Sequence, residues 1–141
     1  MDKFSLHPQL ASDCHLLGDL GLSQVLLLDD CRYPWVILVP RRAGVREIFQ
    51  LAARDRHSLL EESCLTGEFM MQTFTGEKLN VAALGNLVPQ LHLHHVIRKK
   101  DDPAWPGPVW GHTAAVPYPQ QLLEERMRIL REGLSIAASG R

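Results

Sequence analysis

Two continuous apolar segments that lie close together place the strongest constraint on how this chain can fold. They cover residues 23–29, Ser-Gln-Val-Leu-Leu-Leu-Asp, and residues 35–40, Trp-Val-Ile-Leu-Val-Pro. Uninterrupted apolar runs of this length are typical of central strands in a sheet that is covered on both faces. The five residues between them, Asp-Cys-Arg-Tyr-Pro, have turn chemistry, so a hairpin is predicted.

The rest of the chain supplies helices and further strands around this hairpin. We expect strands at residues 15–20, 79–83 and 90–98, a short helix at 8–13 and one or two helical turns at 45–50. A long helix is predicted from Asp55, as its N-cap, to Phe74, and an amphipathic helix over residues 119–138. This order predicts one α+β domain over residues 1–141, with about five antiparallel strands and the long helix on one face of the sheet.

Residues 98–118 are rich in Pro and Trp and are expected to be irregular. Trp105 and Trp110 in this loop need burial. They could cover a site on the sheet, reach a second subunit or pack on their own domain.

Composition excludes several classes of protein. A net charge of −1 gives no electrostatic case for a nucleic-acid or membrane-surface partner, and no apolar run reaches transmembrane length. The first residues do not read as a signal peptide. Cys14, Cys31 and Cys64 are odd in number and have no CxxC spacing, so we expect reduced thiols in a cytoplasmic protein.

The segment 85–98, Gly-Asn-Leu-Val-Pro-Gln-Leu-His-Leu-His-His-Val-Ile-Arg, carries the candidate chemistry. On a strand, side chains alternate between faces, so Gln90, His92 and His94 share one face, and His95 joins the apolar residues on the other. Three hypotheses fit the first face: half-exposed histidines without a function, a metal site, or an imidazole that attacks phosphorus. A metal site would need a third ligand, which the nearby sequence does not supply at a recognisable spacing.

The same segment resembles the signature of the histidine triad (HIT) superfamily of nucleotide hydrolases and transferases. That signature is a strand Asn followed by Gly-Gln-x-Val-x-His-x-His-x-His. The matching residues are Asn80, Gly85, Val88, His92 and His94, and Gly85-Asn86 stands where Gly-Gln is usual. The chain departs from the pattern because Gln90 replaces the first histidine, Asn86 replaces Gln, and the usual Pro before Arg98 is missing. The predicted order of strands and helices agrees with the HIT fold.

The resemblance implies roles for these residues. His92 would be the nucleophile, which attacks the α-phosphorus and forms a nucleotidyl-imidazole that water hydrolyses. Its second ring nitrogen would be held by a backbone carbonyl. Phosphate oxygens would be bound by Asn80, Gly85, Asn86 and His94, and Asp29 would bind the ribose, although Asp29 also suits a plain turn. No metal or other cofactor is required, the partner is a nucleotide, most often a purine, and the protein would be a homodimer.

Gln90 completes the predicted catalytic set of Gln90, His92 and His94. A glutamine can donate a hydrogen bond but cannot pass a proton to a leaving group. The site should therefore prefer leaving groups that need little protonation, such as those of polyphosphates or adenylated acids. The predicted activity is hydrolysis of a dinucleoside polyphosphate, a nucleoside phosphoramidate or an acyl-adenylate. A nucleotidyltransferase, a nucleotide-binding module with little turnover and a metal site remain alternatives. Among the other histidines, His7 and His57 are expected at the surface and His95 in the core.

Overall fold

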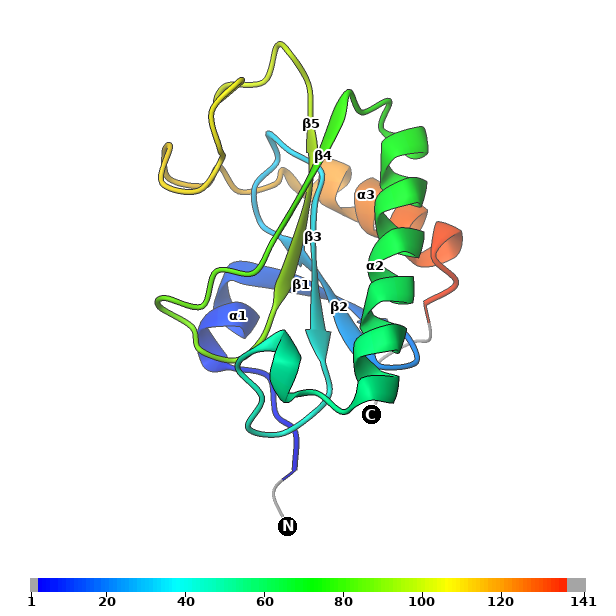
Figure 1. The fold of residues 1–141 in the computed structure, drawn as a ribbon. Coiled ribbons are helices and arrows are strands. Elements are labelled where there is room, and N and C mark those ends of the chain that lie inside the picture. Colours follow the sequence, from blue (N-terminus) through cyan, green and yellow to red (C-terminus); the bar gives the residue numbers. More distant parts are fainter. Residues whose placement is uncertain (1–2, 137–141) are drawn as a thin grey trace.

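Five antiparallel strands form one sheet at the centre of the molecule (Figure 1). The computed structural model describes residues 3–136. The strands are β1 (Cys14–Asp19), β2 (Ser23–Leu28), β3 (Trp35–Pro40), β4 (Lys78–Ala82) and β5 (Leu93–Arg98). Their order across the sheet is β1-β2-β3-β5-β4, so β1 and β4 are the two edges. The predicted α+β architecture with five antiparallel strands is confirmed.

The predicted hairpin lies at the heart of this sheet. Strands β2 and β3 are antiparallel, with Ser23 opposite Pro40 and Leu27 opposite Val36, and every residue of β3 is buried. Strand β3 also pairs with β5, where Ile37 lies opposite His94. The two apolar segments are therefore inner strands of the sheet. Their residues are apolar because both faces of these strands are covered.

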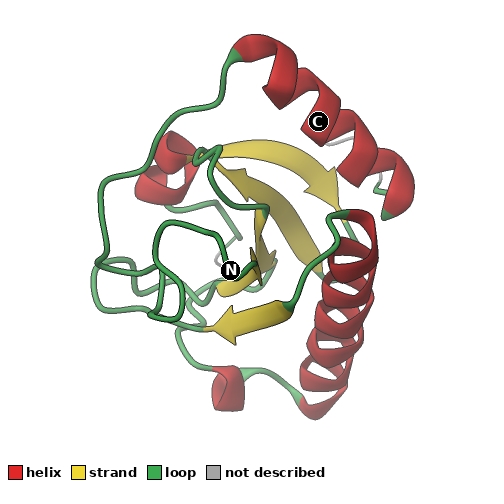
Figure 2. Cartoon of the chain, turned by 90° about the horizontal axis from the view of Figure 1, so that it is seen from above, coloured by secondary structure: helices red, strands yellow, loops and turns green. Residues whose placement is uncertain are grey.

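Helices cover one face and irregular chain covers the other (Figure 2). The long helix α2 (Ala53–Thr73) and the C-terminal helix α3 (Gln120–Gly133) pack on the first face around a core that includes Leu59, Met70 and Leu130. The second face carries the short helix α1 (Pro8–Asp13), the N-terminal segment and part of the loop 99–118. The 3-10 helix η1 (Ile48–Gln50) precedes α2. None of the helices in the described residues is long and apolar enough to cross a membrane.

The start of α2 differs from the prediction. Its N-cap is Ala52, and Asp55 lies in the first turn, where its two oxygens accept hydrogen bonds of 2.7 and 3.0 Å from Arg42. These bonds lower the pKa of Asp55. The helix dipole favours a carboxylate anywhere in the first turn, not only at the N-cap. The prediction that Asp55 is the N-cap was therefore wrong, although Asp55 does lie in the first turn.

The C-terminal helix ends earlier than the sequence predicted. Helix α3 ends at Gly133, and Ser135 adopts a left-handed conformation with φ of 52°. The N–H of Ile136 then donates to the carbonyl of Arg131 at 3.1 Å, as in a common helix-terminating motif. This turn returns Leu134 and Ile136 to the core. The rest of the predicted helix, residues 137–138, lies outside the described residues.

Candidate active site

The two histidines of the motif lie on the loop-covered face of the sheet, as predicted. His94 belongs to β5, opposite Ile37 of β3 and Ala82 of β4. His92 comes just before the strand, because residues 90–92 are not part of the sheet, although the predicted strand 90–98 required it. The N–H of Leu91 donates instead to the carbonyl of Val45 at 3.0 Å. Both side chains are buried, and their ring centroids lie 5.0 Å apart.

His95 points to the opposite face and is a core residue, as predicted. Its Nε2 lies 2.7 Å from the hydroxyl oxygen of Ser63 on α2. Burial lowers the pKa of His95 to about 4. The two adjacent histidines of β5 therefore have different roles: His94 faces the candidate site, and His95 joins the sheet to a helix.

The ring of His92 is oriented by its own backbone. Its Nδ1 lies 2.7 Å from the carbonyl oxygen of Gln90. A carbonyl oxygen can only accept, so Nδ1 must carry the proton and Nε2 must hold the lone pair in the neutral ring. His92 therefore presents an unprotonated nitrogen, which is what a nucleophile requires.

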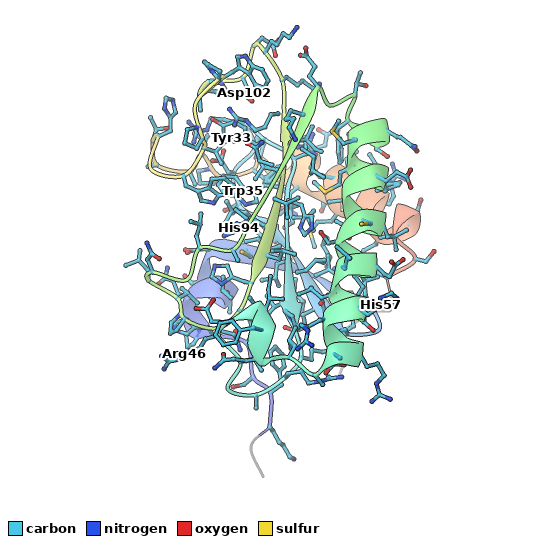
Figure 3. The ribbon with its side chains drawn as sticks, in the orientation of Figure 1. Tyr33, Trp35, Arg46, His57, His94 and Asp102 are labelled. Carbon is cyan, nitrogen blue, oxygen red and sulfur yellow. The ribbon has the colours of Figure 1, made fainter. Side chains whose placement is uncertain are left out.

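His94 is enclosed by aromatic rings. The indole Nε1 of Trp35 donates to Nδ1 of His94 at 2.9 Å, and the Trp110 ring centroid lies 5.4 Å from that of His94 at a steep angle. Figure 3 shows Trp35 and His94 next to each other on the loop-covered side, with His57 far away on α2. Burial, reinforced by His92 and His95, lowers the pKa of His94 to about 3, so this ring is neutral at physiological pH.

The histidines open into a cavity of about 690 Å³, a size that suits a small organic ligand. Its walls are mainly apolar and come from α1, β2, β3, the loop before β5 and Trp110. Polar groups are few, and they include Gln9, Asp13, Asn86, His92 and His94. An apolar cavity with a few convergent polar groups can hold a flat heterocycle and orient it toward the histidines.

A second, smaller cavity of about 270 Å³ adjoins the first at His92. Its lining includes Arg46, Glu47, Gly85, Asn86 and Gln90. Gly85 lets the chain turn tightly here, since a Cβ would lie 3.3 Å from the carbonyl oxygen of Val88 and the turn would have to shift by a few tenths of an ångström. Leu84, Asn86 and His92 line both cavities, so a ligand that extends from one to the other would lie next to these three residues.

Gln90 is placed differently from the catalytic role that the sequence predicted. Its Oε1 accepts from the backbone N–H of His7, and its Nε2 donates to the carbonyl of Ser5, both at 2.9 Å. The amide thus ties the N-terminal segment to the start of β5, because its donor and acceptor match those of an extended backbone. His7, which we expected at the surface, is half-buried and lines the larger cavity.

The structure also separates Asn80 and Asp29 from the histidines. The Oδ1 of Asn80 accepts from Arg98 at 2.8 Å, and Asn80 lines neither cavity. Asp29 accepts from the backbone N–H of Tyr118 and contacts His15, while its neighbour Leu28 lines the larger cavity. Each side chain thus stabilises another part of the chain, and the phosphate role of Asn80 and the ribose role of Asp29 stay predictions.

Two residues at the site, Trp35 and Asp13, were not among the candidates from the sequence, whereas coverage of the site by the loop that carries Trp110 was one of three possibilities. The alternation along β3 puts Trp35 on the face of Ile37, opposite His94, but only the pairing of β3 with β5 reveals it. Trp110 packs on its own sheet, so the loop 99–118 covers the site of its own subunit. Asp13 ends a short helix, and no motif in the sequence marks it.

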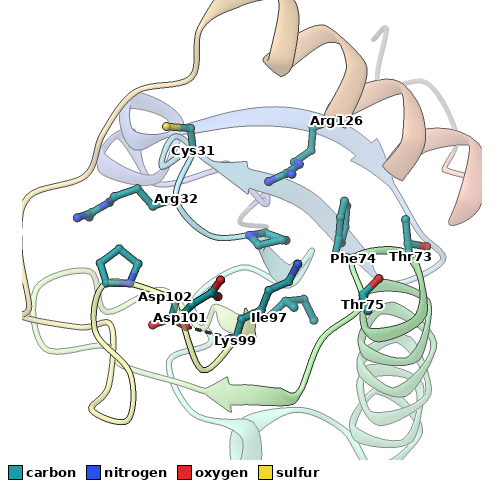
Figure 4. Close-up of a pocket in the computed structure, with 12 residues that line it drawn as sticks. Cys31, Arg32, Thr73, Phe74, Thr75, Ile97, Lys99, Asp101, Asp102 and Arg126 are labelled. Carbon is teal, nitrogen blue, oxygen red and sulfur yellow. Dashed lines mark hydrogen bonds between the residues drawn. The ribbon is translucent and has the colours of Figure 1, made fainter.

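A separate cavity of about 580 Å³ lies beside the C-terminal end of β5 (Figure 4). Its arginines already have partners, since Arg32 pairs with Asp30 and Arg126 lies over the ring of Phe74 at 4.8 Å. It contains neither motif histidine. Among the described residues there is also no group of three or more His, Cys, Asp or Glu side chains that could hold a metal ion.

Comparisons with known proteins identify the family of this chain. The model of the HIT domain family matches residues 9–101. A solved histidine triad protein from Marinobacter aquaeolei is 51% identical with a TM-score of 0.93, and the match covers 95% of this chain and 98% of that one. One from Sinorhizobium meliloti is 41% identical (TM-score 0.90, coverage 92% and 96%), and one from Bradyrhizobium japonicum is 39% identical (TM-score 0.92, coverage 94% and 99%). A search of curated proteins found no match. The chain therefore belongs to the HIT family, within the superfamily of nucleotide hydrolases and transferases, as its motif predicted.

Proposed function

We propose that this protein is a nucleotide hydrolase that works through a covalent nucleotidyl-histidine on His92. The observation that carries the proposal is the 2.7 Å contact between Nδ1 of His92 and the Gln90 carbonyl, which leaves a lone pair on Nε2. That nitrogen lies where a nucleoside-sized cavity meets a smaller polar cavity. A phosphorus atom bound between the two cavities would be within reach of the nucleophile.

The reaction has two displacements. In the first, the Nε2 lone pair attacks the α-phosphorus, a P–N bond forms, and the bond to the leaving group breaks with its electron pair. The ring becomes positively charged, and the Gln90 carbonyl stabilises this charge through the Nδ1 proton. In the second, water attacks phosphorus, the P–N bond breaks, neutral imidazole is restored and a proton passes to solvent.

The larger cavity suits the nucleoside. Its apolar walls can hold a base, a purine by family analogy, and Trp110 offers a ring face to it. Asp13 lines this cavity, and its two oxygens accept from Nε2 of Gln9 at 3.0 Å. A carboxylate oxygen can accept more than one hydrogen bond, so Asp13 is a second candidate beside Asp29 for the ribose hydroxyls. His94 and the turn of Gly85 and Asn86 would bind phosphate oxygens.

The substrate class follows from Gln90, which replaces the first histidine of the HIT motif. Gln90 has no titratable group, so it cannot protonate a departing atom. Leaving groups that depart as stable anions, such as those of dinucleoside polyphosphates or acyl-adenylates, should be favoured over the amine of a nucleoside phosphoramidate. Arg46 in the smaller cavity would attract such an anion.

The test is a panel of these three substrate types with the wild type, His92→Ala and His57→Ala. His57 is exposed on α2, away from both cavities, so its variant controls for the loss of any histidine. The proposal expects His92→Ala to bind nucleotide without turnover and the wild type to yield an acid-labile nucleotide adduct on His92, seen by mass spectrometry. Near-normal turnover by His92→Ala would contradict it.

A second candidate function is supported by the position of Gln90. Its amide is engaged by Ser5 and His7, so the first triad position offers no acid near the leaving group. The site could then bind nucleotide with little turnover, or transfer the nucleotidyl group to an acceptor other than water. An adduct on His92 that resists water but is discharged by a phosphorylated acceptor would identify a transferase, and no adduct with any substrate would identify a binding module.

We also propose that two copies associate through α2 and β4. Leu60 and Leu65 on α2 and Val81 on the edge strand β4 are exposed apolar residues. An apolar helix beside an unpaired strand edge is a surface that a two-fold contact would bury. We further propose that the protein is cytoplasmic.

A further inference from the structure

Trp35 contacts His94, whose ring centroid lies 5.0 Å from that of the proposed nucleophile, His92. Its indole nitrogen is a hydrogen-bond donor and has no accepting lone pair. This nitrogen lies 2.9 Å from Nδ1 of His94, and both residues are buried, with 6% and 7% of their surface exposed. A protonated Nδ1 would place two N–H groups against each other, so Nδ1 must hold a lone pair.

The proton of neutral His94 then resides on Nε2. His92 has the opposite arrangement, since its Nδ1 faces the Gln90 carbonyl and carries the proton. The two rings lie 5.0 Å apart, and both line the larger cavity. In their neutral forms, His92 therefore offers a nitrogen lone pair to a ligand in the cavity, and His94 offers an N–H group.

We propose that Trp35 is a positioning residue that fixes the tautomer of His94, so that the Nε2–H of His94 always donates to a phosphoryl oxygen during attack by His92. This inference rests on the proposed function for the identity of the acceptor. The tautomer itself depends only on the contact between Trp35 and His94.

The surroundings of Trp35 keep its ring in place for this task. Trp35 begins β3 opposite Val96, and its ring meets the rings of Tyr33 and Trp110 edge to face, with centroids 6.1 and 5.8 Å apart. Figure 3 shows Tyr33, Trp35 and His94 in succession along this face of the sheet. A phenylalanine at position 35 would keep most of this packing and would lose only the indole N–H.

The neutral state of His94 suits this role. A cationic His94 beside the imidazolium that forms on His92 would repel it, and burial with the two neighbouring histidines already lowers the pKa of His94 to about 3. A neutral N–H donor can stabilise charge on a phosphoryl oxygen without that repulsion.

The test uses nitrogen NMR of histidine-labelled protein, which distinguishes a protonated ring nitrogen from one with a lone pair. The wild type should show the proton of His94 on Nε2 and that of His92 on Nδ1. Trp35→Phe should give a mixture of His94 tautomers, and kcat should fall about tenfold with KM little changed, as expected for one misplaced hydrogen bond. Trp110→Phe is the matched control for the spectrum, because Trp110 packs on the same ring without donating to it in the described residues.

Each outcome separates this inference from the proposed function. A wild-type spectrum with the His94 proton on Nδ1, or an unchanged tautomer in Trp35→Phe, would overturn the inference even if the enzyme hydrolyses nucleotides. The wild-type spectrum can do so even if Trp35→Phe fails to fold. The predicted tautomers in a protein without turnover would overturn the proposed function and leave the role of Trp35 intact.

Discussion

The buried ion pair between Arg98 and Asp102 offers the sharpest test of what holds the site together. Arg98 and Asp102 expose only 2% and 7% of their side chains, and the carboxylate accepts from the guanidinium at 2.8 and 3.0 Å. It also accepts from the backbone N–H groups of Lys99, Ala104 and Trp105. Asp102 therefore fixes the first turn of the loop that carries Trp110 over the cavity.

Replacing Asp102 with Asn keeps the shape and removes the charge, which leaves Arg98 buried without its counterion. Breaking a buried pair in this way costs about 3–5 kcal/mol. For a domain of this size, that loss corresponds to a fall in Tm of roughly 10–15 °C. Burial of the carboxylate raises its pKa, but the bonds from Arg98 and the backbone outweigh this and lower the pKa of Asp102 overall, so the pair is charged at neutral pH.

The control is a pair with the same spacing on the surface. Arg128 and Glu132 on α3 are also four residues apart, but they expose 60% and 69% of their side chains. Glu132→Gln should change stability by less than about 0.5 kcal/mol. Unfolding by urea, followed by tryptophan fluorescence and circular dichroism, measures both variants. If Asp102→Asn costs no more than Glu132→Gln, burial does not govern the strength of this pair and our reasoning about the loop fails.

Three further predictions concern acid stability, Gln90 and assembly. Folding lowers the pKa of His94 from 6.5 to about 3 and that of His95 from 6.5 to about 4. Below pH 6.5 these two histidines therefore bind protons in the unfolded chain but stay neutral in the folded protein until the pH approaches their lowered pKa values. Stability should therefore fall on acidification, by about 2 kcal/mol per histidine between pH 6.5 and 5, and equal urea midpoints at pH 7 and 5 would contradict this. Gln90→Ala should cost about 1–3 kcal/mol of stability through its two lost hydrogen bonds. Its turnover of a substrate with a good leaving group should fall far less than that of His92→Ala. Equal losses of kcat/KM in the two variants would contradict the assignment of His92 as nucleophile and Gln90 as a structural residue. Leu60→Glu should convert a dimer to a monomer in light scattering, and a wild type that is already monomeric at micromolar concentration would count against the proposed interface.

The sequence by itself determined the central strands of the sheet and the opposite faces of His94 and His95. Continuous apolar runs at 23–29 and 35–40, joined by a short segment with turn chemistry, are typical of central strands, and the alternation along the last strand assigns His94 and His95 to opposite faces. The HIT motif then identified the family. These features depend on local spacing, which a linear chain records directly.

The side-chain partners of the site were decided only by the tertiary structure. Asn80 accepts from Arg98, and Gln90 binds the N-terminal segment, because residues far apart in the chain lie next to each other once the strands pair. The contact between Trp35 and His94 spans 59 residues and likewise depends on the pairing of β3 with β5. A polar side chain bonds whichever complementary group the fold brings near it, and spacing along the sequence does not encode that neighbour.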